Sequence, residues 1–154
     1  MAQTSTRRAR LEDLPVLAVI ERELARSAFP QDPIEDLDYH TDRLRKALAK
    51  EPEGMVVLEG PEGEGLVAWL WVVTKKTLAT GEVYGILRSL YVRPSARNAG
   101  LGAMLAQYAL RFFQERGIAR VVAKVHSRNL AGLRTLEKAG FEGLHVTLER
   151  RADR

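Results

Sequence analysis

The chain has 154 residues, a length that fits one domain covering residues 1–154. It is 45% hydrophobic and 29% charged, which is typical of a soluble globular protein, and its net charge of +4 suits an anionic partner. The sequence has no cysteine, which excludes disulfides, thiolate metal sites and a cysteine nucleophile.

Membranes and nucleic acids are not expected partners. No apolar run approaches the length of a membrane span, and the N-terminus lacks a signal-peptide core, so a cytoplasmic location is the default expectation. The basic residues are interspersed and form no aromatic-basic recognition motif, so nothing points to nucleic acid.

The first third of the chain predicts one strand followed by two helices. Residues 5–10 read as a strand. Apolar residues at helical spacing then predict a helix from Glu12, and residues 29–33 end it. Asp32 is the expected cap of a second helix that begins at Pro33 and runs to Leu48.

The middle of the chain predicts a hairpin. Residues 55–58 and 66–73 read as strands on either side of a glycine-rich turn, and residues 74–81 form another turn. Trp69 and Trp71 share one strand face. They could line a pocket, although indoles packed under helices are the commoner arrangement.

A strand over residues 82–92 leads into a glycine-containing loop. Pro94 interrupts the strand, and apolar residues at helical spacing predict a helix from Leu101 to Gly117. Glycines and free N–H groups at a helix start attract phosphate, and Arg97 adds a cation there. The loop could equally be a tight turn. The dinucleotide-binding and nucleotide-triphosphatase phosphate-loop patterns both fit poorly.

A second segment follows downstream. A short strand over residues 121–125 precedes Asn129 and another helical pattern, which contains Glu137 and Lys138 and ends near Gly140. Residues 141–149 then read as a last strand.

Together these segments resemble the GNAT superfamily of acyl-CoA-dependent N-acetyltransferases. The family's main signature, Arg/Gln-x-x-Gly-x-Gly/Ala after a Leu-Tyr-Val strand, is matched by residues 90–92, Arg97, Gly100 and Gly102. Its second element, an Asn, a helix and then Glu-Lys-x-Gly-Phe, is matched by Asn129 and residues 137–141. The likeness extends over almost the whole chain.

The resemblance implies an α/β fold with a central mixed sheet flanked by helices, in the order β-α-α-β-β-β-α-β-α-β. In such proteins the first two helices and their connection form one wall of the acceptor site, which here means residues 28–40, including Phe29. The acyl-CoA normally enters where the fourth and fifth strands splay apart, here residues 90–92 against residues 121–125.

The resemblance also implies acetyl-CoA as co-substrate and an amine acceptor that attacks its thioester directly, with no metal. The pyrophosphate would lie on the loop amides, and the Val92 backbone would bond the pantetheine. Asn129 would bond the pantetheine arm, cap its helix, or do both. The residues expected to bind the coenzyme are Leu90, Tyr91, Val92, Arg97, Asn98, Ala99, Gly100, Leu101, Gly102, Ala103 and Asn129.

Three positions depart from the family pattern. Leu136 stands where many members have a Tyr acid, and Arg88 and Lys124 stand where many have a Glu base. One hypothesis is a non-catalytic acyl-CoA-binding sensor. The other is an acetyltransferase that needs neither group, because its acceptor is an amino acid or peptide N-terminus with a pKa of about 7.7–8.0 rather than a lysine amine at about 10.4.

A few side chains remain as candidates for the acceptor site. If Arg88 and Lys124 reach the cleft, they favour an acceptor that carries a carboxylate; the alternative is that both are surface charges. His126 is a candidate base because its ordinary pKa is near 6.5, although a lone histidine at a strand end is more often structural. The histidines show no metal-binding spacing. Analogy with the family leaves a homodimer open.

Overall fold

The computed structural model describes residues 5–97 and 99–152. Within them the chain forms five strands, four α-helices and three short 3-10 turns. In chain order the elements are β1 (Ser5–Arg8), η1 (Leu11–Asp13), α1 (Leu14–Ala28), α2 (Leu37–Lys50), η2 (Pro52–Gly54), β2 (Met55–Glu59), β3 (Leu66–Lys76), β4 (Val83–Val92), η3 (Pro94–Ala96), α3 (Leu101–Glu115), β5 (Val121–Ala123) and α4 (Leu130–Lys138).

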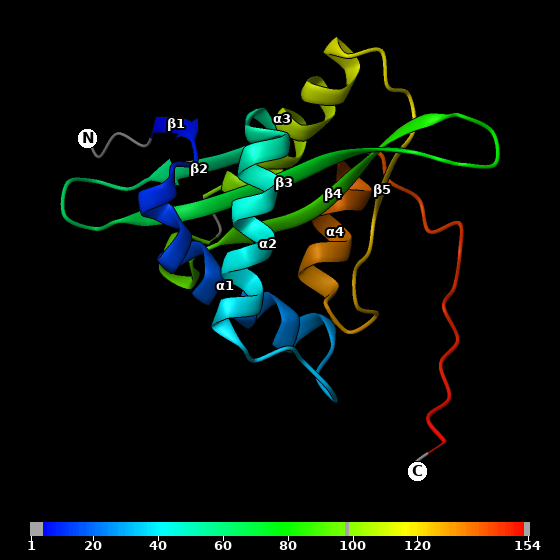
Figure 1. Ribbon diagram of the computed structural model, residues 1–154, viewed down its shortest axis with the longest axis horizontal. Coiled ribbons are helices and arrows are strands. Elements are labelled where there is room, and N and C mark those ends of the chain that lie inside the picture. The colour runs from blue at the N-terminus through cyan, green and yellow to red at the C-terminus, as the bar shows by residue number, and fades with distance from the viewer. Residues whose placement is uncertain (1–4, 98, 153–154) are drawn as a thin grey trace.

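The strands form one mixed sheet in the order β1-β2-β3-β4-β5. The first three junctions are antiparallel, and β5 pairs parallel to β4. Helices α1 and α2 lie over one face of the sheet, and α3 and α4 lie over the other (Figure 1). The mixed sheet with helices on both faces confirms the expected architecture.

Each face of the sheet has its own apolar core. Val56, Leu70 and Leu87 pack under α3, whereas Val57 and Trp69 pack under α1 and α2. The two sets alternate along each strand, because successive side chains in a strand point to opposite faces. The sheet therefore separates two apolar cores.

Strand β4 contains an extra residue. Trp71 of β3 is opposite Ser89, but the next residue, Val72, is opposite Leu87, so Arg88 has no partner in β3. Such a bulge puts two consecutive residues on one face of the strand. Arg88 contacts Trp71 on the α2 side, and Ser89 points to α1 on that same side.

Strands β4 and β5 part directly after this pairing ends. Their register runs from Gly85 opposite Val121 to Leu87 opposite Ala123, and goes no further. Arg88 pairs with neither neighbouring strand, and from Ser89 onward β4 has a strand partner on its β3 side only. The gap therefore opens at the bulge, just before residues 90–92, where the resemblance to the GNAT family predicts the coenzyme.

Helix α3 is held against the start of β4 by a close contact. A Cβ atom built on Gly85 would lie 2.5 Å from the Phe113 ring, so only glycine lets this ring reach the strand. Phe113 is fully buried. This contact fixes the position of α3 and hence of its N-terminus beyond the end of β4.

Three details differ from the sequence-based expectations. Helix α2 begins at Leu37 rather than Pro33, and its cap is Asp36 rather than Asp32. The parallel strand spans Val121–Ala123 instead of residues 121–125. The last predicted strand is wrong, because residues 141–150 adopt no regular structure.

The missing strand has a physical explanation. After Gly140, whose φ is +98°, the tail leaves the sheet and finds no neighbouring strand (Figure 1). A strand needs a partner for its backbone groups, so the alternating Leu144, Val146 and Leu148 stay exposed.

In the described part of the chain, no helix is long and apolar enough to cross a membrane.

Candidate functional site

The N-terminus of α3 lacks the side-chain cap that two other helices have. Asp36 accepts from the Asp38 N–H at 2.9 Å at the start of α2, and Asn129 accepts from the Gly132 N–H at 3.0 Å at the start of α4. At α3 the cap residue is Gly100, and none of the side chains described in residues 5–97 and 99–152 caps the first turn. Among these residues its first amides therefore have no side-chain acceptor, as an anion site requires.

The local backbone keeps this helix start open. Gly100 has a φ of +78°, a left-handed conformation that costs other residues about 1–2 kcal/mol. A Cβ built on Gly102 would lie 3.7 Å from Thr135 and 3.8 Å from Leu90, so the chain itself leaves room there. Ala99 and Ala103 are exposed, and Leu101 is half-buried. These residues fit a diphosphate held by backbone amides.

Arg97 does not stand free beside these amides. Its Nε donates to the Val92 carbonyl oxygen at 3.0 Å, which ties the loop back to the end of β4. Asn98, also expected at the coenzyme, lies outside the described residues. Arg93 fastens the same loop from the other side, where its Nη1 donates to the Glu64 carbonyl at 2.7 Å.

The end of β4 presents backbone groups to the gap. The Arg93 N–H bonds the Val67 carbonyl on the β3 side, whereas the Val92 carbonyl points away from β3 to Arg97. Backbone groups alternate sides along a strand, so those of Leu90 face the gap as well. Tyr91 lies between them on the α1 side, half-buried.

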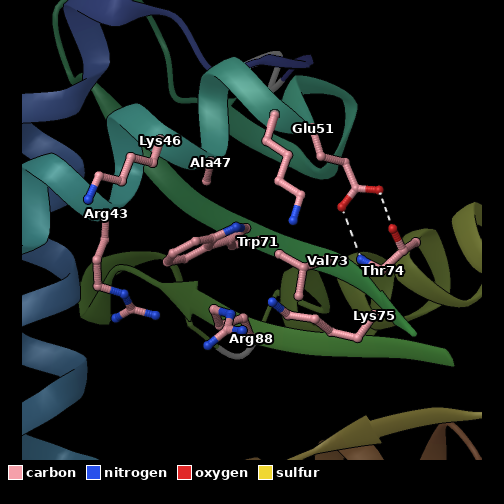
Figure 2. Close-up of a pocket in the computed structure, with 10 residues that line it drawn as sticks. Arg43, Lys46, Ala47, Glu51, Trp71, Val73, Thr74, Lys75 and Arg88 are labelled. Atoms are coloured by element: carbon pink, nitrogen blue, oxygen red, sulfur yellow. Dashed lines mark hydrogen bonds between the residues drawn. The ribbon is translucent and has the colours of Figure 1, made fainter. Parts of the chain in front are cut away.

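A cavity of about 350 Å³ lies on the α2 side, next to the bulge. Its lining comes from α2 and the adjoining Glu51, from β3, and from Arg88 of β4, and Figure 2 shows side chains entering it from these elements. The cavity is lined by Arg43, Lys46, Ala47, Lys50, Glu51, Trp71, Val73, Thr74, Lys75 and Arg88.

Trp71 forms an aromatic wall of this cavity. The guanidinium of Arg43 lies 5.2 Å from its ring centre and that of Arg88 lies 5.5 Å away. Both distances suit cation–π contact. Arg88, expected near the acceptor, is thus brought into a cavity, and Trp71 both packs in the core and lines it. Trp69 only packs.

Glu21 is a polar residue of this region to which the sequence analysis gave no role. It is 7% exposed, and its Oε2 and Oε1 accept from Trp69 Nε1 at 2.9 Å and Ser89 Oγ at 3.0 Å. Burial raises the pKa of Glu21, against the effect of these two hydrogen bonds. The sequence feature that could have identified Glu21 is a carboxylate at a core position of the α1 pattern, between Leu17 and Leu24.

The other expected acceptor residues lie elsewhere. Phe29 and His126 meet at a second cavity of about 500 Å³, between the α1–α2 connection and the loop after β5. The His126 Nδ1 accepts from the Arg128 N–H at 3.1 Å. Lys124 is exposed and lines neither cavity. The structure therefore does not bring Lys124 together with Arg88 in one pocket.

The position of the family's tyrosine is closed to proton transfer. Leu136 is buried in the apolar cluster under α3 and α4. Asn129 caps α4, which is one of the two roles expected for it. Among residues 5–97 and 99–152, no three His, Asp or Glu side chains gather where they could hold a metal ion.

Comparisons with known proteins agree with the fold. The model of the acetyltransferase (GNAT) family matches residues 17–141. Mycothiol acetyltransferase from Rhodococcus erythropolis is 34% identical over 68 residues, which cover 44% of this chain and 21% of that protein. The match thus spans about a fifth of the curated relative's length.

Two solved structures share the fold. A predicted acetyltransferase with acetyl-CoA from Clostridium acetobutylicum superposes with a TM-score of 0.76 and 19% identity, over 97% of this chain and 96% of that one. A GCN5-related N-acetyltransferase from Ralstonia eutropha superposes with a TM-score of 0.75 and 23% identity, over 97% and 99%. Because the family model matches most of the sequence, this chain belongs to the GNAT family of acetyltransferases.

Proposed function

We propose that this protein transfers the acetyl group of acetyl-CoA to a primary amine of a small molecule or a peptide N-terminus, by direct attack within a ternary complex. The observation that best supports this is the gap between β4 and β5. It begins at Arg88, with uncapped amides beyond it on the α3 face and a cavity beside it on the α2 face.

On the α3 face, the coenzyme's diphosphate would lie on the first-turn amides of residues 101–103. Gly100 and the exposed Ala99 leave the approach clear, and Arg97 would add charge from the neighbouring loop. The gap-facing backbone of Leu90 and Val92 would bond the pantetheine, with Tyr91 behind it. The amide of Asn129 has its oxygen in the α4 cap, so only its NH₂ group would donate to the pantetheine.

Bound acetyl-CoA supplies an electrophilic thioester carbonyl. The amine nitrogen forms a bond to the carbonyl carbon, the carbon–sulfur bond breaks, the thiolate leaves and the amine proton passes to solvent. The chain's main contribution is to align the two reactants through the gap, an effect that can supply roughly 7–11 kcal/mol. A gap-facing N–H aimed at the developing oxyanion would supply about 2.7–4 kcal/mol more.

The site has no acid or base where the family commonly places them. Leu136 is apolar and buried, and Arg88 is a cation that cannot accept a proton. Positive charges close to an amine disfavour its protonated form and lower its pKa. The cations around the cavity would thus help to deprotonate the acceptor, most readily an α-amine whose pKa is already about 7.7–8.0.

The test is binding followed by turnover. Acetyl-CoA at a hundred times its Kd should stabilise the fold by about 2.7 kcal/mol, measured as a thermal shift. Release of coenzyme A should then be faster with α-amines, such as glycine amide, than with the side-chain amine of Nα-acetyl-lysine. A preference for the lysine side chain would contradict the proposed acceptor.

The alternative function is a sensor that binds acyl-CoA without catalysis. The buried Leu136 and the cationic Arg88 and Lys124 favour it, because they stand at all three positions where the family usually has a proton-transfer group. Tight binding of acetyl-CoA with no release of coenzyme A in the presence of any amine would establish the sensor and exclude the enzyme.

A further inference from the structure

The cavity next to the bulge is strongly and unevenly charged. Five cationic side chains enter its lining from three elements, namely Arg43, Lys46, Lys50, Lys75 and Arg88. Arg43 and Arg88 approach one another beside Trp71, and Lys75 points into the same space from β3 (Figure 2). A solvated charged face would spread such residues outward, whereas here Arg43, Lys75 and Arg88 converge on one concavity.

The one carboxylate in the lining does not neutralise these charges. Glu51 accepts from the Thr74 N–H at 3.0 Å through Oε1 and from the Thr74 Oγ at 2.8 Å through Oε2. Both of its oxygens are therefore turned to β3. Within the described part of the chain, none of the five cations forms an ion pair. The cavity keeps a net charge of +4, from five positive and one negative side chain.

Arg43 and Arg88 lie against the same indole ring although their positive charges repel one another. Both lie on the ring of Trp71, at 5.2 and 5.5 Å. Partial burial, and then the charge of Arg43, lower the pKa of Arg88. An anion between the two guanidiniums would remove the repulsion and would be bound by donor forks that suit carboxylate and phosphate.

We propose that this cavity binds the anionic part of the acceptor, so that the acceptor is a small primary amine carrying two or more negative charges, such as a phosphate ester or two carboxylates. This inference rests on the proposed function and specifies its acceptor. A volume of about 350 Å³ holds a small molecule rather than a polymer.

The distance to the gap fits such a molecule. Arg88 lies two residues before Leu90, which corresponds to about 7 Å along a strand. An acceptor whose anionic group is bound at Arg43 and Arg88 therefore needs only a few bonds between that group and its amine. The cations would also lower the pKa of that amine, so recognition and deprotonation come from the same residues.

The first experiment measures anion binding without turnover. Calorimetry with inorganic phosphate and with citrate is done at saturating coenzyme A, so that the α3 amides are already occupied. Lys75→Gln and Arg43→Gln should each weaken the binding by about fivefold, the effect of one partly screened charge. The matched control is Lys76→Gln, which removes the same charge from the next residue of β3, outside the cavity. This variant should change the affinity for the anion less than twofold.

The second experiment measures acceptor choice. Phosphoethanolamine against ethanolamine, and aspartate against alanine, compare charged and less charged amines, and the two pairs distinguish phosphate from carboxylate. The more anionic acceptor of a pair should have a kcat/KM at least about tenfold higher. In Lys75→Gln its KM should rise by a larger factor than kcat falls, because the lost charge mainly binds the acceptor and is only one of several that lower the pKa of its amine.

The outcomes separate the two proposals. Equal rates for charged and uncharged amines, or equal anion affinities in Lys75→Gln and Lys76→Gln, would overturn the inference and leave the acetyltransferase function intact. Transfer to no amine would overturn the proposed function together with the acceptor, and the calorimetry would then decide alone whether the cavity is an anion site.

Discussion

The two faces of the sheet offer anions different chemical groups. On the α3 face these are backbone amides at a helix start that no described side chain caps. On the α2 face they are five long cationic side chains around an indole ring. The amide site depends on backbone geometry and a glycine at positive φ, whereas the side-chain site depends on which residues occupy exposed positions of α2, β3 and β4. A single side chain can therefore block the amide site, whereas substitutions around the cavity can change which anion the side-chain site prefers.

The largest expected effect blocks the amide site. Ala103→Asp puts an exposed carboxylate in the first turn of α3, where the helix dipole favours it by about 0.3–1 kcal/mol. The same charge about 4 Å from a diphosphate costs several kcal/mol, so acetyl-CoA should bind at least about a hundredfold more weakly. Calorimetry measures the loss of affinity for acetyl-CoA, and a thermal melt measures the gain in stability.

The opposite signs of these effects make the result easy to interpret. Misfolding cannot explain lost binding in a variant whose melting temperature is unchanged or higher. Gln107→Glu, one turn further along α3 and exposed, is the control and should bind acetyl-CoA as the parent does. Unchanged affinity in Ala103→Asp would mean that the diphosphate does not lie at this helix start.

The second prediction concerns the buried carboxylate on the other face. Glu21→Ala leaves the buried N–H of Trp69 without a partner, which costs about 1–3 kcal/mol of unfolding free energy. Glu21→Gln keeps an acceptor for it and should cost less. Chemical denaturation measures both variants, and equal losses would show that the Trp69 bond is unimportant.

The same residue predicts a pH dependence. Because burial raises the pKa of Glu21, folding favours its protonated form. Its contribution to stability is therefore complete below the ordinary carboxyl pKa and is lost as pH rises through the raised value. The stability of Glu21→Gln relative to the parent should increase over that range. A constant difference across the range would contradict the raised pKa.

A third prediction separates the two roles of Asn129. Asn129→Ala removes the α4 cap and should cost about 1 kcal/mol, whereas Asn129→Asp keeps the cap and should leave stability nearly unchanged. Both variants lack the NH₂ donor, so both should weaken acetyl-CoA binding if that group bonds the pantetheine. Weaker binding in Asn129→Ala alone would assign the residue to capping only.

The smallest effect is expected outside both faces. Removing residues 144–154 deletes exposed Leu144, Val146 and Leu148, and a 3.9 Å contact between Arg151 and Asp32. The stability should fall by less than about 1 kcal/mol, because residues 144–150 are exposed. A loss of several kcal/mol in a thermal melt would mean that this segment does pair with the sheet, as its alternating pattern predicts.

The amide site could be anticipated from sequence because it depends on local order. Strand, glycine loop and helix are consecutive, so the residues from Leu90 to Gly102 specify where the helix start lies. The parting of the strands was also expected, but only from the resemblance to the GNAT family, in which the fourth and fifth strands splay apart. The last strand was not predicted correctly, because an alternating pattern indicates that a segment can form a strand and says nothing about whether a partner lies beside it.

The cationic cavity could be only partly anticipated. Arg43, Lys46 and Lys50 have the spacing i, i+3 and i+7, which places them on one helix face. Their convergence with Lys75 and Arg88 depends on pairing between distant segments. Whether Arg88 faces the cavity or the α3 core depends on one extra residue in β4, and a single sequence does not reveal a bulge.

That extra residue makes the length of β4 more important than its composition. It shifts the alternation by one position, so that Leu87 and Leu90 both face α3 although three positions separate them. Deleting one residue here would turn the second half of the strand over and expose its apolar side chains to the cavity. Redesign of the acceptor preference should therefore exchange side chains around the cavity and preserve the number of residues between Val83 and Val92.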